Sequence, residues 1–197
     1  MSLDLANPWQ RQEFLVERAL AHGHVVLTGL GLGLLARDLE LLDCVEKVTV
    51  LEADKDVIDL WRTLCRINNY QPQKIEVINQ RADQVQQIKH DCLFLDHWES
   101  HSENLVVAEA RTLASQSSAD TVWFWPGALY YMQWCKQGQH AMTTDTYQQW
   151  RDHVAIPKLP QAAPIQVLVN QYQVYKEADY EGYRSMLANW SKAPLLE

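Results

Sequence analysis

The sequence predicts a single α/β domain built on a mostly parallel β-sheet with helices on both faces. Short β-branched and apolar runs alternate with segments of helical periodicity, and a glycine-rich turn separates the first run from the helix that follows it. The chain has 197 residues, of which 47% are hydrophobic. This length suits one domain with a sizeable core, whereas two domains would each be small. We therefore expect one active site.

The alternation of strands and helices follows the pattern of apolar residues. Runs rich in Val, Ile, Leu and aromatic side chains predict strands over residues 24–28, 48–51, 74–78, 91–95 and 121–125. Apolar residues at helical spacing predict helices over residues 34–42, 55–68 and 103–115. Because a connection between parallel strands must return across the sheet, this order indicates a parallel sheet covered on both faces.

Both ends of the chain extend this core. Apolar residues at helical spacing behind Pro8 predict a helix within residues 1–21. Beyond Pro126 the sequence predicts helices over 127–137 and 144–153 and a closing strand over 165–175. We thus expect one domain over residues 1–197, in which the N-terminal helix (1–21) precedes a core (22–125) and a C-terminal part (126–197).

Composition and charge exclude several classes of protein. No apolar run approaches the roughly 20 residues of a membrane-spanning helix, and the first residues do not resemble a secretory signal, so we expect a cytoplasmic protein without a membrane partner. The four cysteines form no Cys-x-x-Cys pair and are typical of reduced core thiols. A formal net charge of −8, with scattered Lys and Arg, disfavours nucleic acid as a partner.

Three of the seven glycines, Gly29, Gly31 and Gly33, lie between the first strand and the following helix. Glycine permits positive φ angles and lets a ligand approach the backbone, and a helix start offers unpaired N–H groups. This placement favours a ligand with a carboxylate or a phosphate. The alternative is a tight turn that only packs the helix on the sheet.

Glu52 ends the second predicted strand, 23 residues after Gly29. A carboxylate at this position can accept hydrogen bonds from both hydroxyls of a ribose. The two signals together place a nucleoside across the carboxyl ends of the first two strands, where open α/β sheets bind ligands. A dinucleotide motif would have its third glycine at position 34, which is Leu34 here, so a nicotinamide-dependent oxidoreductase is disfavoured.

Residues 25–33, VVLTGLGLG, resemble motif I of the class I S-adenosylmethionine-dependent methyltransferases, and the similarity continues through VTVLEADKDVIDL at residues 48–60. The resemblance covers residues 22–98, about half of the chain. It implies a Rossmann-like fold with S-adenosylmethionine as the cofactor. The cofactor-binding residues that it implies are Gly29, Gly31, Gly33, Glu52 at the ribose and Asp83 at the adenine.

The family's fourth strand ends at the active site, and here that strand is followed by Asp96 and His97. Methyl transfer is an in-line displacement, and much of its acceleration can come from holding the nucleophile in line with the methyl group. We predict that Asp96 orients an acceptor amine or hydroxyl, or removes its proton, and that it also contacts the cofactor. His97 is the other catalytic candidate, because an unperturbed imidazole has a pKa near neutrality. A helix cap is the alternative role for such residues.

The predicted function is methyl transfer from S-adenosylmethionine to a small-molecule or protein acceptor that the sequence does not identify. The alternative from another class is a non-catalytic S-adenosylmethionine-binding or scaffold protein of the same fold. The VTVLEAD segment is also similar to the spermidine synthase branch, which transfers an aminopropyl group. That branch carries an N-terminal β domain, for which this chain has no room, and its paired acidic residues for polyamine binding are not evident here. The oligomeric state is not predicted.

Two other groups of residues have competing interpretations. Potential metal ligands gather around the fourth strand, at His90, Cys92, Asp96, His97, Glu99 and His101. We predict no metal site, because strand alternation points several of these side chains in opposite directions and no paired-cysteine or HExxH pattern accompanies them. Packing, rather than a wall for a flat acceptor, is expected of the aromatic residues Trp123, Trp125, Tyr130, Tyr131 and Trp134.

Overall fold

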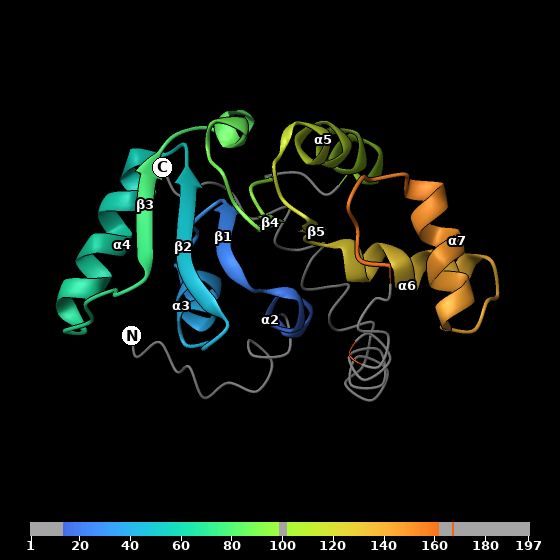
Figure 1. Cartoon of the computed structure of the whole chain (residues 1–197), viewed down its shortest axis with the longest axis horizontal. Coiled ribbons are helices and arrows are strands. Elements are labelled where there is room, and N and C mark those ends of the chain that lie inside the picture. The colour runs from blue at the N-terminus through green and yellow to red at the C-terminus, as the bar shows by residue number, and fades with distance from the viewer. Residues whose placement is uncertain (1–13, 99–101, 162–166, 168–197) are drawn as a thin grey trace, which may run out of the picture.

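The computed structural model describes residues 14–98, 102–161 and 167, which contain one five-stranded sheet. Its strands are β1 (Gly23–Thr28), β2 (Val45–Glu52), β3 (Ile75–Asn79), β4 (Cys92–Leu95) and β5 (Thr121–Phe124). All neighbouring strands are parallel, in the order β3-β2-β1-β4-β5 (Figure 1). The predicted α/β fold with a parallel sheet is confirmed, in a Rossmann-like form.

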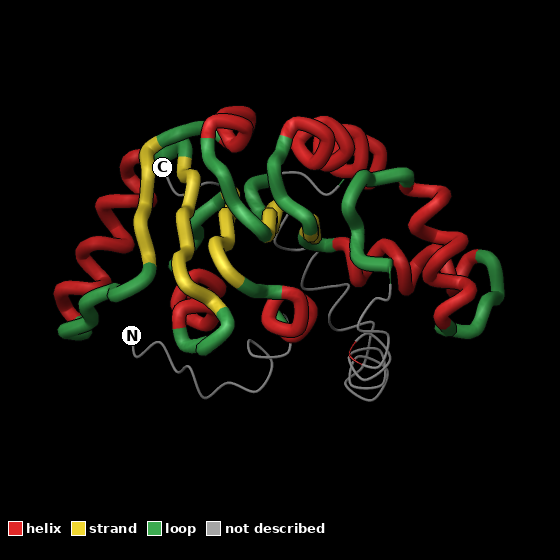
Figure 2. Tube along the Cα trace, in the orientation of Figure 1, coloured by secondary structure: helices red, strands yellow, loops and turns green. Residues whose placement is uncertain are grey.

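Helices surround this sheet (Figure 2). They are α2 (Leu15–Leu20), α3 (Leu34–Glu40), α4 (Lys55–Ile67), the 3₁₀ helix η1 (Ala82–Gln87), α5 (Glu103–Gln116), α6 (Gly127–Gln137) and α7 (Thr144–Val154). Because crossovers between parallel strands are right-handed, α3 and α4, which lead from β1 toward β3, cover one face. The elements that lead back toward β5, η1 and α5, pack together on the other face. None of the helices in the described residues is long and apolar enough to cross a membrane.

Most predicted elements agree with the observed ones to within a few residues, and the differences have local causes. The connection from β3 to β4 is the 3₁₀ helix η1, which the sequence did not predict because only Val85 of its residues is buried. Of the predicted N-terminal helix, residues 1–13 lie outside the described part of the chain. The closing strand predicted over 165–175 also lies outside it, except for Val167, whose backbone is helical.

The core is centred on the two middle strands, β1 and β4. Val25 and Val26 are fully buried, as is all of β4. Burial on both faces explains why these strands appear in the sequence as continuous apolar runs rather than alternating ones. Thr28 at the end of β1 pairs with Leu95 at the end of β4, so the segments that follow these residues begin side by side.

Helices α6 and α7 lie at the β5 end of the sheet, the end opposite to α4 (Figure 1). Aromatic side chains pack them there. The ring of Trp150 on α7 lies 6.5 Å from that of Trp123 and 5.5 Å from that of Tyr131. Trp123, Tyr130 and Tyr131 are buried, which confirms the expected packing role for these three residues. The two remaining residues of the stretch, Trp125 and Trp134, are half-buried.

Candidate functional site

The carboxyl ends of β1, β2 and β4 bring together three of the predicted site residues, Gly29, Glu52 and Asp96. The Gly29 N–H donates to the carbonyl oxygen of Leu51 at 2.8 Å, and the Asp96 N–H donates to that of Thr28 at 3.0 Å. Trp125 joins the same edge, because its N–H donates to the Leu95 carbonyl at 2.8 Å. The sheet therefore gathers residues from distant parts of the sequence along one edge.

The three loop glycines have φ angles of 86°, 50° and 74°, but their surroundings differ. A Cβ atom on Gly29 would lie 1.9 Å from the Asp96 carbonyl oxygen, and one on Gly33 would lie 2.3 Å from the Trp61 indole nitrogen. A Cβ on Gly31 would have nothing within 4 Å. Gly29 and Gly33 therefore allow close packing within the protein, whereas Gly31 faces open space where a ligand can approach the backbone.

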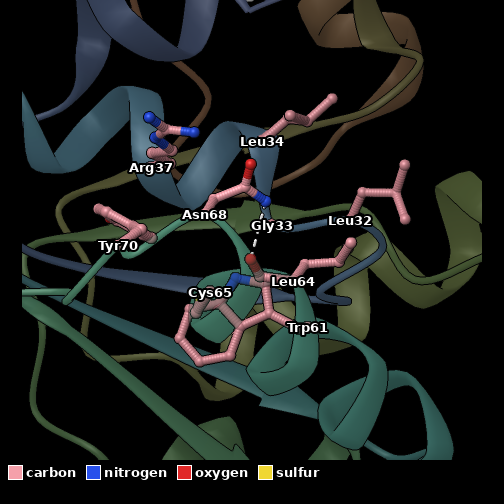
Figure 3. Close-up of a pocket in the computed structure, with 9 residues that line it drawn as sticks. All are labelled: Leu32, Gly33, Leu34, Arg37, Trp61, Leu64, Cys65, Asn68 and Tyr70. Atoms are coloured by element: carbon pink, nitrogen blue, oxygen red, sulfur yellow. Dashed lines mark hydrogen bonds between the residues drawn. The ribbon is translucent and has the colours of Figure 1, made fainter. Parts of the chain in front are cut away.

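Gly33 also borders a small pocket between α3 and α4 (Figure 3). The pocket measures about 30 Å³, which holds one or two water molecules but no nucleoside. Its lining residues are Leu32, Gly33, Leu34, Arg37, Trp61, Leu64, Cys65, Asn68 and Tyr70. The pocket is thus a consequence of how the two helices pack around Trp61.

We expect Gly33→Ala to lower the free energy of unfolding by about 2–3 kcal/mol. The alanine backbone would be strained at a positive φ, and its Cβ would also displace the Trp61 side chain. Urea denaturation measures this loss. Gly31→Ala is the matched control, since its φ is also positive but its Cβ enters open space, and it should cost only the backbone strain, about 1–2 kcal/mol. Equal losses for the two variants would contradict the packing role of Gly33.

Glu52 ties the glycine loop to the end of β2. Its Oε2 atom accepts the Leu30 N–H and its Oε1 atom accepts the Asp54 N–H, each at 2.8 Å. Each carboxylate oxygen can accept a second hydrogen bond, and the side chain is partly exposed, so Glu52 remains able to accept from ribose hydroxyls. Its role in fixing the path of the loop was not predicted.

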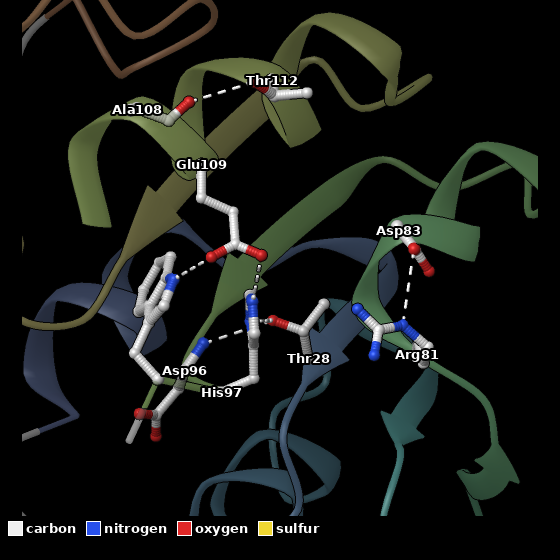
Figure 4. Close-up of polar contacts among 9 residues, drawn as sticks. Thr28, Arg81, Asp83, Asp96, His97, Ala108, Glu109 and Thr112 are labelled. Atoms are coloured by element: carbon white, nitrogen blue, oxygen red, sulfur yellow. Dashed lines mark hydrogen bonds and ion pairs between the residues drawn. The ribbon is translucent and has the colours of Figure 1, made fainter. Parts of the chain in front are cut away.

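Asp83 lies farther out, in η1 after β3. Its carboxylate is exposed and forms an ion pair with Arg81, with 3.5 Å between Oδ2 and Nε (Figure 4). Its carboxylate pairs with Arg81 and not with Gly29, Glu52 or Asp96. Its predicted role at an adenine ring stays a prediction.

Asp96 combines access to solvent with partial desolvation. The side chain is exposed, yet it lies against enough protein on its other sides that desolvation raises the pKa of its carboxyl to about 6. Its backbone N–H lies 3.3 Å from Thr28 Oγ1, in addition to its bond with the Thr28 carbonyl. A carboxyl with a pKa near neutrality is suited to accepting a proton at physiological pH.

His97 is held by hydrogen bonds at both ring nitrogens (Figure 4). Nδ1 lies 2.6 Å from Thr28 Oγ1, and Nε2 lies 3.3 Å from Oε1 of Glu109 on α5. Burial lowers the pKa of the imidazole, which keeps it neutral at neutral pH. These contacts favour a positioning role for His97 over direct proton transfer. Glu109 had no signal in the sequence, because only the fold brings α5 to this edge.

Within the described residues, no group of three or more His, Cys, Asp or Glu side chains is placed to hold a metal ion. Of the potential ligands around β4, His90 lies at the opposite, amino end of the strand, where its Nε2 is 3.0 Å from Ser117 Oγ. Cys92 is buried beside His22, with 3.2 Å between Sγ and Nδ1. Glu99 and His101 lie outside the described residues.

Negative charge predominates at this edge of the sheet. Carboxylates are contributed by Glu52, Asp83, Asp96 and Glu109, whereas Arg81 contributes a positive charge that is paired with Asp83. Such a field attracts a cationic sulfonium or ammonium group and repels the pyrophosphate of a dinucleotide. The residues present therefore fit S-adenosylmethionine better than a nicotinamide cofactor.

No protein-family model matches the chain, and a search of the curated proteins finds no similar sequence. Among solved structures, the chain is similar to the methyltransferase domain of bacterial CtHen1-C, with 19% identity over 74% of this chain and 82% of that one, at a TM-score of 0.48.

Spermidine synthases are also among the similar structures. One, in complex with the transition-state analogue AdoDATO, is 20% identical over 59% of this chain, at a TM-score of 0.45, and another, from Thermotoga maritima, is 18% identical over 59%, at a TM-score of 0.46. The match spans 42% and 43% of their lengths, so less than half of each. In the sequence, the glycine motif at residues 25–33 resembles the methyltransferases, and the VTVLEAD segment at residues 48–54 is also similar to the spermidine synthases. At such low sequence identity these similarities do not establish a function, which has to be argued from the residues of the site.

Proposed function

We propose that the chain is an S-adenosylmethionine-dependent methyltransferase whose cofactor lies across the carboxyl ends of β1, β2 and β4. The arrangement of Gly31, Glu52 and Asp96 supports this proposal. Gly31 leaves the loop backbone open, Glu52 offers carboxylate lone pairs beside that loop, and Asp96 presents a solvent-accessible carboxyl at the end of the adjacent strand. When bound, S-adenosylmethionine would supply a methyl group on a cationic sulfur.

Each residue of this edge has its own role in binding the cofactor or the acceptor. Gly31 lets the cofactor approach the backbone, Glu52 accepts hydrogen bonds from the ribose, and Asp83 contacts the adenine. Asp96 orients the acceptor, a small molecule or a protein side chain, and accepts a proton from its amine or hydroxyl. Because the carboxylates attract positive charge, they also stabilise the cationic cofactor in the site.

Release of S-adenosylhomocysteine tests this proposal. The chain is incubated with methyl-labelled S-adenosylmethionine and a panel of small amines, small alcohols and peptides, and the labelled product is separated by chromatography. A methyltransferase transfers label to at least one acceptor class and releases S-adenosylhomocysteine in equal amount. A scaffold binds the cofactor without release. An aminopropyltransferase instead consumes decarboxylated S-adenosylmethionine and releases methylthioadenosine.

We expect Glu52→Gln to weaken the binding of S-adenosylmethionine by about 1–3 kcal/mol, because hydrogen bonds to a charged acceptor are lost. Calorimetric titration of the folded variant measures the change. Glu76→Gln on β3 is the matched control, since Glu76 is exposed and forms an ion pair with Lys47, away from the glycine loop. An affinity of Glu52→Gln equal to that of the control would place the ribose elsewhere.

A further inference from the structure

Four side chains from three elements meet beside Asp96, and we call Thr28, His97, Trp98 and Glu109 the clasp. Figure 4 labels three of them, Thr28, His97 and Glu109. Glu109 on α5 uses its two carboxylate oxygens for two successive residues. Oε1 lies 3.3 Å from His97 Nε2, and Oε2 accepts the Trp98 indole N–H at 2.8 Å. On the other side, His97 Nδ1 lies 2.6 Å from Thr28 Oγ1. The clasp thus joins β1 to α5 through the segment that carries Asp96.

One placement of the hydroxyl and imidazole protons gives every donor in the clasp an acceptor. Thr28 is fully buried, so its hydroxyl needs partners within the protein. The hydroxyl oxygen accepts the Asp96 N–H and its proton is donated to His97 Nδ1. The remaining imidazole proton is then on Nε2, where it is donated to Glu109. Every polar atom of the clasp named here has a partner, and the imidazole is neutral.

The clasp holds the segment that carries Asp96. A Cβ on Gly29 would approach the His97 Cα to 3.1 Å, so the segment after β4 lies directly against the glycine loop. The His97 and Trp98 rings also lie together, with 4.6 Å between their centroids, and the Trp98 and Phe124 rings are perpendicular, with 6.4 Å between their centroids. Hydrogen bonds and ring contacts hold His97 and Trp98, the two residues that follow Asp96. The Asp96 backbone therefore has little freedom to move.

We propose that Glu109 is a positioning residue of the acceptor site, which acts through His97 and Trp98 to hold the Asp96 carboxyl in its partly desolvated position. This inference rests on the proposed function, in which Asp96 acts on the acceptor. It adds a residue from α5, a helix outside the segments that resemble the methyltransferase motifs. Glu109 is about half exposed, so its replacement should leave the chain folded.

Two nuclear magnetic resonance measurements test the clasp in the absence of cofactor. Nitrogen-15 shifts of the His97 ring, identified among the seven histidines with a His97→Gln variant, report the tautomer. Carbon-13 shifts of the Asp96 carboxyl report its pKa. In the wild-type chain we expect a proton on Nε2 and an Asp96 pKa of about 6.

Three variants give distinct expected results. Glu109→Ala should leave the imidazole as a mixture of tautomers and lower the Asp96 pKa toward its ordinary value of about 4, because the segment is no longer held to α5 and the partly desolvated carboxyl can move further into solvent. Glu109→Gln should keep the raised Asp96 pKa while reversing the tautomer, since its amide can donate to Nε2. Glu103→Ala, the same change near the start of α5, should leave both signals as in the wild type.

A Glu109→Ala chain that shows the wild-type tautomer and the wild-type Asp96 pKa would overturn the proposal. A lower melting temperature with both signals unchanged would overturn it as well, because Glu109 would then only stabilise the fold. Neither signal involves the cofactor, so the two hypotheses fail separately. A wild-type chain that binds no S-adenosylmethionine would contradict the proposed function. The role of Glu109 in methyl transfer would then be contradicted too, even if both signals show that the clasp is formed.

Discussion

Gly31→Val is expected to reduce the affinity for S-adenosylmethionine by about 100-fold or more while the chain still folds, because close backbone approach at this turn requires glycine. A Cβ at this position enters open space, so the new side chain meets no protein atom and instead occupies the space in which the cofactor would contact the loop. The φ angle of 50° adds strain of about 1–2 kcal/mol for a non-glycine residue, which a domain of ordinary stability tolerates.

Asn69→Val is the matched control for this strain. Asn69 also has a φ of 50°, but it lies exposed beyond the end of α4. It should therefore lose stability like Gly31→Val and bind the cofactor like the wild type. Urea denaturation and calorimetric titration of both variants separate the two effects. A folded Gly31→Val chain with wild-type affinity would show that the cofactor does not contact the glycine loop.

Asp96→Asn is expected to lower the turnover number by about 10²- to 10⁴-fold, the usual contribution of a positioned general base. Affinity for S-adenosylhomocysteine should change by much less, because the amide keeps the size of the carboxyl and one acceptor oxygen. Release of S-adenosylhomocysteine with an acceptor from the panel measures turnover. Asp120→Asn, at the amino end of β5, is the control and should keep wild-type turnover.

The raised pKa of Asp96 gives this variant a characteristic dependence on pH. In the wild type kcat/KM should rise as the pH increases through about 6, where the carboxyl loses its proton, and the Asn variant should lack this step. The contribution of the Asp96 carboxyl to the free energy of unfolding changes with pH in the opposite direction. A pKa raised above that of the unfolded chain means that stability present below about pH 4 is lost as the pH rises through 6. Asp96→Asn should therefore raise the melting temperature at pH 8 but not at pH 4.

The strands and most helices could be predicted from the sequence because the pattern of burial is simple. β1 and β4 are buried on both faces and are continuous apolar runs, and the amphipathic pattern of α4 follows from its single buried face. The 3₁₀ helix η1 has one buried residue and no such pattern. Its prediction would have required knowledge of the neighbouring α5, on which it packs.

The site could be predicted only in part. The glycine spacing located the loop, but the different roles of the three glycines depend on residues distant in the sequence. Gly29 packs against Asp96 and Gly33 packs against Trp61, whereas Gly31 faces open space. The positions of Glu52 and Asp96 followed from their places at strand ends. The contacts of Glu109 with His97 and Trp98 depend on where α5 crosses the sheet, and a local pattern of residues contains no information on that.

Calorimetric titration of the wild-type chain with S-adenosylmethionine, S-adenosylhomocysteine and, as the control, NADH tests the central claim most directly. The proposed site predicts micromolar binding of the first two, because both contain the ribose and adenine that Glu52 and Asp83 are proposed to bind, and no binding of NADH, whose pyrophosphate meets an excess of carboxylates. Binding of NADH without binding of S-adenosylmethionine would contradict the claim. So would the absence of binding to all three ligands.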